Sequence, residues 1–350
     1  MNPWLFRQFR SAETRLHELS YLFWECTTRC NLHCRHCGSD CTVGSRNPDM
    51  PLQDFLQALD TIPQKEIPKG FTVVLTGGEP LLRPDIEACG KALQERGLGW
   101  GMVSNGFFYD EAMQRRLLSA GLGALTISLD GLEENHNRMR GHKESYQHAL
   151  KAISLAAKAP SLAFDVVTCV TRRNLPELPD IHQLLSSLGV PQWRLFTVIP
   201  IGRAAKDPDM QLSPAETRQL MDFIVSNRKE GPMRTTFSCQ GYLGPYEEKV
   251  REGRFFCHAG INIASVLVDG RICACPDIDR DAFSQGSIYS DNLWEVWNTR
   301  FQAFRDHSWA RKGICEACRE WKNCLGGGMH NWHGDGTSPL ECHYLKCSAK

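Results

Sequence analysis

Between residues 21 and 199, short apolar runs alternate with stretches that have a helical pattern. Each run is apolar throughout and is bounded by Gly, Pro or Asn, which is typical of strands that are covered on both faces. Such alternation predicts a parallel sheet built from right-handed βαβ units. Six units are fewer than the eight of a closed barrel, so we predict an α/β fold with a partial (β/α)6 TIM-like barrel. The expected strands are 21–25, 71–76, 100–104, 124–129, 163–170 and 193–199, and the expected helices are 84–96, 110–120, 146–159 and 176–188.

The pattern changes after residue 203. A segment rich in Asp and Pro leads into a helical pattern at 215–229, and 231–256 is irregular in sequence. From residue 257 onward, glycines and cysteines dominate. This region is expected to be too rich in loops to be held by apolar burial alone, so bound metal would supply stability. The predicted organisation is an N-terminal extension (1–20), a barrel (21–203), a bridging region (204–256) and a small cysteine-rich C-terminal domain (257–350).

Charge and hydropathy exclude several classes of protein. Lys+Arg and Asp+Glu both total 40, so the formal net charge is zero and bulk electrostatic capture of nucleic acid or of an anionic membrane is not expected. The first twenty residues contain five charged side chains and no apolar core, which is not the pattern of a signal peptide. No segment has the ~20 apolar residues of a membrane span. We therefore expect a cytoplasmic protein.

Cysteine is the outlying residue type, with sixteen in the chain. In a large chain without an export signal, clustered thiols more often bind metal or do redox chemistry than form disulfides. Isolated cysteines pack as small hydrophobic residues and are expected to be structural. One group is Cys26, Cys30, Cys34, Cys37 and Cys41; a second is Cys257, Cys273, Cys275, Cys315, Cys318, Cys324, Cys342 and Cys347; the isolated ones are Cys89, Cys169 and Cys239.

Three cysteines with the spacing Cys30-x3-Cys34-x2-Cys37 follow the first expected strand. Three thiolates on one short loop can hold three corners of an iron–sulfur cubane, which ordinarily takes four cysteines. A metal position without a protein ligand is typical of a catalytic rather than a structural centre. Two alternatives remain open at this point, namely a zinc site with Cys26 or Cys41 as fourth ligand, and a disulfide.

Polar motifs follow the next three expected strands directly. Gly-Gly-Glu-Pro at 77–80 has two glycines that let a ligand approach the backbone and a carboxylate that could pair with an ammonium group. Ser-Asn-Gly at 104–106 and Ser-Leu-Asp-Gly at 128–131 would suit ribose hydroxyls and a carboxylate, and Arg140 could clamp a carboxylate. Each motif alone is an ordinary turn. Because ligands in such folds bind beyond the carboxyl ends of the strands, the four clusters together predict a cofactor site.

These motifs resemble those of the radical S-adenosylmethionine (SAM) enzymes over residues 21–203. The segments CTTRCNLHCRHC, GGEP, VSNG, SLDG and RMRG follow the order of that family's motifs. The resemblance implies that Cys30, Cys34 and Cys37 bind a [4Fe–4S] cluster whose fourth iron is chelated by SAM. Glu79 would contact the SAM amino group, and reductive cleavage would yield a 5′-deoxyadenosyl radical that takes hydrogen from a substrate. His36 stands where the family usually has an aromatic residue near the adenine. The implied cofactor-binding residues are Gly77, Gly78, Glu79, Ser104, Asn105, Ser128, Arg140 and His36.

The second cysteine group resembles the SPASM domain, an extension that usually holds two auxiliary [4Fe–4S] clusters. Its characteristic spacings are present, and residues 293–305 resemble its connecting helix. The usual pattern has a cysteine where this chain has Gly328, so one cluster lacks a ligand; structural zinc is the alternative reading. The implied ligands are Cys315, Cys318, Cys324 and Cys347 for a complete cluster, and Cys257 and Cys275 for a second, with Cys239, Cys273 and Cys342 as further candidates.

The resemblance also implies classes of substrate and partner. Our leading hypothesis is modification of a peptide or protein side chain by hydrogen abstraction. The alternatives are a sulfatase-maturase-like oxidation with Asp277 as base, a small-molecule dehydrogenase or cofactor-biosynthesis enzyme, and a non-catalytic zinc scaffold. About twenty residues precede the first strand, fewer than a leader-binding domain needs, so recognition would come from the barrel mouth, the C-terminal domain or a separate protein. The first motif resembles most a branch associated with bacterial lipoprotein gene systems, and a flavodoxin or ferredoxin would donate electrons.

Overall fold

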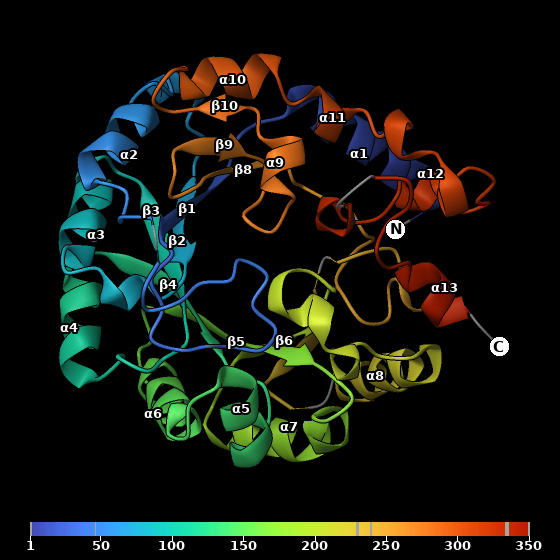
Figure 1. Cartoon of the computed structure of the whole chain (residues 1–350), viewed down its shortest axis with the longest axis horizontal. Helices are drawn as coiled ribbons and strands as arrows, with labels where there is room; N and C mark the ends of the chain where they lie inside the picture. The colour runs from blue at the N-terminus through green and yellow to red at the C-terminus, as the bar shows by residue number, and fades with distance from the viewer. Residues whose placement is uncertain (1, 46, 229–230, 239, 333–335, 349–350) are drawn as a thin grey trace.

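The protein is built around one curved sheet of ten strands. The computed structural model describes residues 2–45, 47–228, 231–238, 240–332 and 336–348. From one edge to the other, the strand order is β10-β9-β8-β1-β2-β3-β4-β5-β6-β7. Strands β1 to β6 pair in parallel with their neighbours in sequence and form an arc, with α2, α3, α4, α6 and α7 outside it and the loop after β1 inside it (Figure 1). The predicted partial barrel is confirmed.

The six barrel strands and the helices α3, α4, α6 and α7 lie close to the predicted ranges, whereas α2 and α5 were not predicted. Their ends are set by local signals, as at Asp110, whose side chain accepts a hydrogen bond from the Met113 amide at 2.8 Å and begins α4. The strands are β1 (Tyr21–Thr27), β2 (Thr72–Gly77), β3 (Gly99–Ser104), β4 (Leu122–Ser128), β5 (Ala163–Val170) and β6 (Gln192–Thr197). The connecting helices are α2 (Leu52–Leu59), α3 (Ile86–Glu95), α4 (Glu111–Ser119), α5 (Glu133–Arg140), α6 (Ser145–Ala156) and α7 (Leu178–Ser187), with 3-10 turns η1 (Gln64–Glu66), η2 (Pro80–Leu82) and η3 (Leu175–Glu177).

The second half of the chain extends both edges of the sheet. Strand β7 (Arg234–Phe237) pairs with β6 inside the stretch predicted to be irregular, which corrects that prediction. Strand β8 (Ile263–Val266) pairs in parallel with β1, and β9 (Arg271–Cys273) and β10 (Gly286–Ser287) continue antiparallel. These strands have two to four residues. They are shorter than the windows in which hydrophobic periodicity identifies a strand.

The remaining helices surround the open side of the arc (Figure 1). The N-terminal extension is a helix, α1, whose Phe6 is buried with Phe256 and Ile261 of the C-terminal half. These helices are α1 (Pro3–Leu16), α8 (Pro214–Asn227), α9 (Arg280–Phe283), α10 (Leu293–Thr299), α11 (Gln302–Arg305), α12 (Trp321–Cys324) and α13 (His343–Ser348), with 3-10 turns η4 (Gly202–Lys206), η5 (Pro208–Met210), η6 (Gly244–Tyr246), η7 (Ser308–Ala310), η8 (Gly313–Cys315) and η9 (Met329–Asn331).

One apolar core runs through the barrel and much of the C-terminal half. Trp297, Phe301 and Phe304 are fully buried in the same cluster as Trp24 and Trp193 of the barrel strands. The expectation that the C-terminal half lacks enough apolar burial is therefore wrong for α10 and α11. None of the described helices combines the length and the hydropathy needed to cross a membrane.

Candidate active site and metal centres

The three predicted ligands of the first constellation lie together in the loop between β1 and α2. Cys30 and Cys34 are buried and Cys37 is half-buried. They pack in one small cluster with Cys41 and with the partly buried Phe107. The loop thus presents three thiols at the carboxyl end of β1, on the inside of the arc.

The two neighbouring cysteines differ in position. Cys26 is in the main core, and its thiol donates to the Thr76 carbonyl at 3.5 Å, so it is not part of the group. Cys41 is next to the triad, and its thiol hydrogen-bonds to Cys37. This bond outweighs burial and lowers the pKa of Cys37 to about 6. Cys41 is therefore a hydrogen-bonding neighbour of the predicted ligand Cys37.

The thiol positions also bear on the zinc alternative. Zinc with sulfur ligands at 2.3 Å holds its sulfurs about 3.8 Å apart in a tetrahedron. Among the described residues, one set of three or more Cys, His, Asp or Glu ligand atoms lies within 4.8 Å, and it consists of His36, Asp130 and Cys169. In both cysteine groups, the described sulfur atoms are thus farther apart than the ligands of a mononuclear zinc site.

The glycines of the 77–80 motif hold the cysteine loop to β2. The Gly78 amide donates to the Thr27 carbonyl at 2.8 Å, and the Glu79 amide donates to the Arg29 carbonyl at 2.9 Å. A Cβ on Gly77 would lie 2.0 Å from the Thr27 oxygen, and one on Gly78 would lie 2.1 Å from the Arg29 oxygen. Only glycine permits this backbone contact. The two glycines thus position the loop, and a contact with SAM stays a prediction.

The segment after β6 holds the other end of the loop. The Arg203 guanidinium donates to the Cys34 carbonyl at 2.7 Å and to the Cys41 carbonyl at 3.2 Å. The Arg203 amide donates to the Cys37 carbonyl at 3.0 Å. Gly202 has φ +54°, and a Cβ there would lie 2.5 Å from the Cys37 oxygen. The cysteine loop is therefore fixed from both sides of the barrel.

Glu79 organises the polar groups beyond β2 and β3. Its carboxylate is fully buried and accepts hydrogen bonds from the Leu81 amide (3.1 Å), the Ser104 hydroxyl (2.9 Å) and the Asn105 amide (2.8 Å). Burial nevertheless raises the pKa of Glu79. The Asn105 side-chain amide lies 4.0 Å from the Cys30 sulfur. The 77–80 and 104–106 motifs are thus joined beside the first cysteine.

A buried ion pair lies beside the second cysteine. Arg140 Nη2 lies 2.6 Å from Asp130 Oδ2, and Arg140 Nη1 donates to the Cys34 sulfur at 3.7 Å. Burial opposes the charge on Asp130, but Arg140, His36 and His136 outweigh it and lower the pKa of Asp130. The Asp130 amide donates to His136 Nδ1 at 3.0 Å, and burial lowers the pKa of His136 to about 3, so that ring is neutral. Arg140 is therefore a fixed cation beside a ligand sulfur.

The surroundings of the triad fit a bound polar group. Three buried nitrogens have no hydrogen-bond partner among the described residues, namely Asn31 Nδ2, His36 Nδ1 and Arg140 Nε. Asn31 accepts a bond from Asn105, and Arg140 contacts Cys34, so these nitrogens lie close to the thiols. Buried polar groups are normally satisfied, and a bound cofactor would complete them. Ser128 is buried at the end of β4, as predicted.

Sequence reasoning did not assign three of the residues at this site. Asp130 lies in the 128–131 motif, where only Ser128 was selected, and Arg203 has no motif. Cys169 was expected to be structural, yet its sulfur shares the close group with His36 and Asp130. Burial and then the charges of Asp130 and Asp277 raise the pKa of Cys169. Asp277, the predicted base, therefore lies within electrostatic range of the barrel interior.

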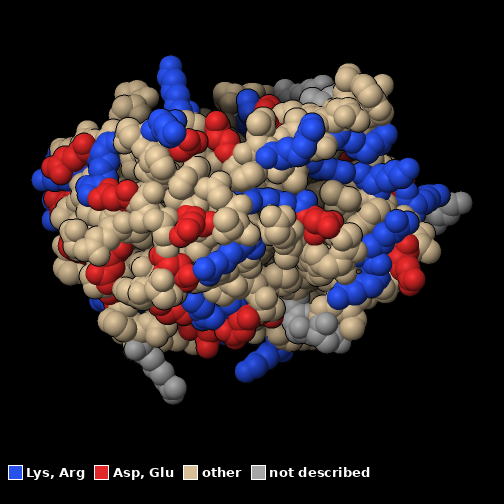
Figure 2. Space-filling view, turned by 90° about the horizontal axis from the view of Figure 1, so that it is seen from above, with Lys and Arg blue, Asp and Glu red and all other residues tan. Residues whose placement is uncertain are grey.

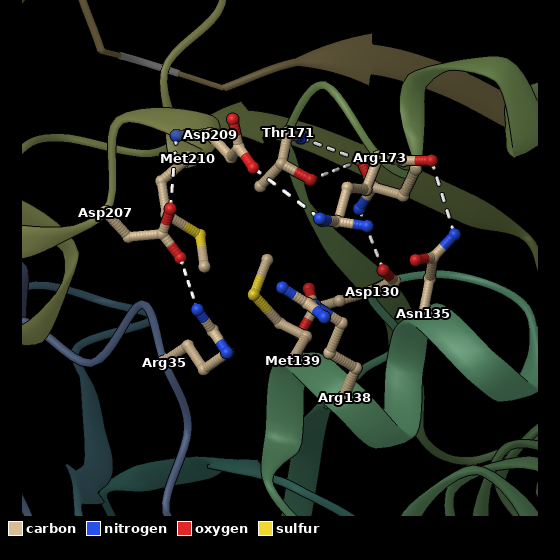
Figure 3. A pocket seen from close by; sticks show the side chains of 11 residues that line it. Arg35, Asp130, Asn135, Arg138, Met139, Thr171, Arg173, Asp207, Asp209 and Met210 are labelled. Atoms are coloured by element: carbon tan, nitrogen blue, oxygen red, sulfur yellow. Dashed lines mark hydrogen bonds and ion pairs between the residues drawn. The ribbon is translucent and has the colours of Figure 1, made fainter.

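A pocket that opens to solvent borders this site between α5, the segment after β5 and η5 (Figure 3). Asp130 forms part of its wall, and Arg138 and Arg173 reach it from α5 and from the segment after β5. Arg173 lies 3.6 Å from Asp209, a loose contact between exposed side chains. Arg138 makes no ion pair with any described residue. The pocket is thus lined by both basic and acidic side chains, namely Arg35, Arg138, Arg173, Asp130, Asp207 and Asp209.

Four cysteines of the second constellation lie within electrostatic range of one another. Burial raises the pKa of Cys315 to about 11 and that of Cys324 to about 12, and the charge of Cys342 is the next contribution to each. Cys318 also contributes to the pKa of Cys315, Cys324 and Cys342. The group of Cys315, Cys318, Cys324 and Cys342 is called the four-cysteine group below.

Cys347 does not join the four-cysteine group, which differs from the ligand set that the resemblance implies. Cys342 precedes α13, and Cys347 lies five residues further along it. At 3.6 residues per turn, five residues rotate a side chain about 140° around the helix axis. Cys347 is accordingly buried in the main core, where Arg251, Glu247 and Arg218 act on its pKa more strongly than Cys342 does. Because Cys342 acts directly on Cys315 and Cys324, we predict Cys342 as the fourth ligand.

Replacing these two cysteines separately tests the choice. We expect Cys342→Ala to lower the iron content of anaerobically purified protein by about four atoms per chain, because a [4Fe–4S] cluster needs all four thiolates. Cys347→Ala should keep all the iron and lose about 1 kcal/mol of stability through a small cavity. Iron and sulfide analysis with EPR spectroscopy measures both. Loss of a cluster signal from Cys347→Ala alone would reverse the assignment.

The remaining cysteines belong to different surroundings. Cys257 and Cys275 both pack against the main core, and Cys257 also packs beside Cys324 and Cys342 against Tyr242 and Phe255. Cys273 is fully buried on β9 and acts as a core residue. Cys239 lies outside the described residues. Ligation of a second auxiliary cluster by Cys257 and Cys275 stays a prediction.

Gly328 stands where the usual pattern has a cysteine. A Cβ on Gly328 would lie 2.4 Å from Cε1 of His330 and 2.8 Å from the Gln240 carbonyl. The imidazole of His330 therefore occupies the space into which a side chain at 328 would point. Position 328 therefore has neither a cysteine nor the space that a cysteine side chain needs.

Comparison with known proteins identifies the family. Residues 24–185 match the radical SAM superfamily, and residues 257–319 match the SPASM iron–sulfur cluster-binding domain. The AdoMet-dependent heme synthase of Nitratidesulfovibrio vulgaris is 25% identical over 96% of this chain and 95% of its own. The mycofactocin maturase MftC of Mycobacterium tuberculosis is 29% identical over 93% and 82%.

Solved structures show the same fold. Streptococcus suis SuiB bound to S-adenosylmethionine superposes with a TM-score of 0.72 at 15% identity, over 97% of this chain and 81% of that one. The two domain matches lie on the two cysteine constellations. The chain therefore belongs to the radical SAM superfamily and carries a SPASM domain, which makes it an enzyme that uses S-adenosylmethionine, a [4Fe–4S] cluster and auxiliary iron–sulfur clusters.

Proposed function

We propose that this enzyme abstracts a hydrogen atom from a peptide or protein side chain and so modifies it after translation. One observation carries the proposal. Cys30, Cys34 and Cys37 lie together, beside buried polar side chains at the carboxyl ends of the barrel strands. Similarity to the mycofactocin maturase MftC, and to the fold of SuiB bound to the precursor peptide SuiA, supports a peptide substrate. Cytoplasmic location is part of the proposal, because thiolate clusters need a reducing compartment.

The chain's own residues would perform three tasks. The three cysteines would hold the cluster, and the 77–78 glycines with Arg203 would keep their loop in one conformation. Glu79, Asn105, Ser128 and His36 would orient the SAM amino, ribose and adenine groups from the strand ends. Arg140, held by Asp130, would stabilise negative charge at Cys34. SAM, when bound and reduced by one electron, supplies the 5′-deoxyadenosyl radical that takes the hydrogen.

The substrate would enter at the pocket between α5, the segment after β5 and η5 (Figure 3). Arg138 and Arg173 suit a carboxylate of the substrate, because guanidinium groups pair with carboxylates in a planar, bidentate way. Asp277 lies within range of Cys169 and could take the proton if the modification is an oxidation. A separate recognition protein, such as one linked to a lipoprotein, and a flavodoxin or ferredoxin as electron donor complete the proposal.

A second candidate is a tetrapyrrole substrate. The chain matches AdoMet-dependent heme synthases over 87–96% of its length at 25–26% identity. The same arginines would then bind propionate groups. This candidate corresponds to the cofactor-biosynthesis alternative given in the sequence analysis. It would use the same 5′-deoxyadenosyl radical.

One experiment separates the two candidates. Anaerobic enzyme with dithionite and SAM is given either the peptides encoded beside its gene or iron-coproporphyrin III, and 5′-deoxyadenosine and substrate mass are measured. We expect a peptide to raise 5′-deoxyadenosine formation at least about tenfold over the unstimulated rate, as correct substrate binding assembles the site. A mass change in the peptide would confirm the proposal. Stimulation and mass change with the porphyrin alone would overturn it in favour of the second candidate.

A further inference from the structure

Helix α1 exposes an apolar stripe to solvent. Leu5, Phe9 and Leu16 are 53%, 46% and 72% exposed, and Trp4 beside them is 58% exposed. The first three are four and seven residues apart, so at 3.6 residues per turn they lie on one side of the helix. Among the described residues, eleven large apolar side chains are exposed, and four of them belong to this helix of 14 residues. The apolar stripe of a surface helix normally faces the core, so this one is unusual.

The other side of α1 binds the helix to the protein. Phe6 is buried, and Arg10 donates to the Lys322 carbonyl at 2.7 Å and to the Asn323 carbonyl at 3.1 Å. Arg7 donates to the Asn323 side chain at 3.3 Å. These contacts hold α1 beside α12 (Figure 1). Because this inner side is fixed, the apolar stripe cannot rotate toward the core.

The surface around the stripe is basic. Helix α1 and residues 307–326, together called the α1–α12 surface here, carry seven basic and three acidic side chains, a surplus of four positive charges in a chain of zero net charge. Seen from above, basic side chains predominate at the end of the molecule where Figure 1 places α1 and α12 (Figure 2). Arg15, Arg311 and Lys322 are exposed and form no ion pair with any residue that the structure describes. An apolar stripe beside uncompensated basic side chains is typical of helices that bind a membrane surface.

The charge of this surface separates the candidate occupants of the stripe. Two copies of the chain joined through α1 would bring two positive surpluses together, and like charges that face each other oppose association. Anionic phospholipid headgroups complement the surface instead, and Trp, which α1 exposes near its first turn, is enriched at the membrane–water interface. With 14 residues, α1 is shorter than the ~20 residues that span a bilayer, so it would lie in the plane of the interface.

We propose that α1 binds the surface of an anionic phospholipid bilayer. The apolar stripe inserts at the boundary of headgroups and acyl chains, and the basic side chains of the α1–α12 surface lie against the lipid phosphates. The net charge of zero excludes bulk electrostatic capture, so binding needs the apolar area and the local charge together. The inference goes beyond the proposed function, because it holds for either candidate substrate.

Co-sedimentation of the anaerobically purified holoenzyme with vesicles tests the proposal. The probes are vesicles of mixed phosphatidylglycerol and phosphatidylcholine, and vesicles of phosphatidylcholine alone. At low salt, the unmodified enzyme should bind the anionic vesicles at least about tenfold more tightly than the neutral ones. Leu5→Ser/Phe9→Ser should weaken binding to the anionic vesicles at least about tenfold, because it removes the inserted apolar area. Arg15→Glu/Lys322→Glu should reduce the preference for anionic lipid.

The matched control is Val225→Ser/Tyr289→Ser, which replaces two exposed apolar side chains on α8 and after β10. It should bind the vesicles like the unmodified enzyme. All four apolar side chains are exposed, so the variants should fold, which circular dichroism checks. Equal binding of Leu5→Ser/Phe9→Ser and the control would overturn the proposal, as would failure of the unmodified enzyme to bind anionic vesicles. Dimerisation in sedimentation velocity that Leu5→Ser/Phe9→Ser abolishes would overturn it in favour of a second copy.

Discussion

Cys34→Ala is expected to abolish the formation of 5′-deoxyadenosine by the anaerobic enzyme, to below about a thousandth of the unmodified rate, because the cofactor carries the chemistry and the protein alone has none to replace it. Cys30→Ala should behave alike. All three thiols come from one loop that Gly78 and Arg203 fix in place, so a thiol from elsewhere in the chain is not expected to reach the vacant corner.

Cys41 could replace Cys37 as a ligand, which complicates the result expected for Cys37→Ala. It is buried beside the triad and hydrogen-bonds to Cys37. If Cys41 can move into the place of Cys37, the Cys37→Ala enzyme will retain part of its iron, whereas Cys34→Ala will not. Iron analysis of Cys37→Ala and Cys37→Ala/Cys41→Ala measures this directly. Equal iron in both shows that Cys41 is no substitute ligand.

The matched control is Cys26→Ala. This thiol lies four residues before the triad but faces the main core, where it donates to the Thr76 carbonyl. Removing it should cost about 1–2 kcal/mol of stability through a cavity and leave 5′-deoxyadenosine formation unchanged. Loss of activity in Cys26→Ala with activity retained in Cys34→Ala would contradict the proposed ligand set.

The barrel could be predicted because its signals are local. Each of β1 to β6 has six to eight residues and is bounded by turn residues, so hydrophobic pattern identifies it. The short strands β7 to β10 could not be predicted, because their stability comes from pairing with the edges of a sheet that already exists. Helix α1 was missed for a related reason, since its burial depends on Phe256 and Ile261, far away in sequence.

Spacing predicted which cysteines lie together only where one loop carries them. The loop of Cys30, Cys34 and Cys37 is continuous, so its thiols are close whatever the rest of the chain does. The choice between Cys342 and Cys347 depends on the rotation of α13 against the core, which spacing does not contain. The same limit applies to Cys169, which looks isolated in the sequence and reaches the site through the register of β5.

Removing one partner of the buried Asp130–Arg140 pair is expected to have the largest effect on stability of any change at the site. Asp130→Asn leaves the Arg140 charge buried and unpaired beside Cys34, and Arg140→Met does the same to Asp130. Breaking a buried pair from one side costs about 3–5 kcal/mol. At roughly 2 °C for each kcal/mol, Tm should fall by about 6–10 °C in either variant.

The double variant shows whether pairing is the cause. With both charges removed, no buried charge is left over, so Asp130→Asn/Arg140→Met should be more stable than either single variant. Glu87→Gln, which breaks the exposed Glu87–Arg116 contact at 3.3 Å, is the control and should cost less than about 1 kcal/mol. Thermal unfolding of the cluster-free proteins measures all four, so that cluster loss does not enter the comparison. Additive losses in the double variant would mean that the two side chains act separately, and that Asp130 does not serve to hold Arg140 at Cys34.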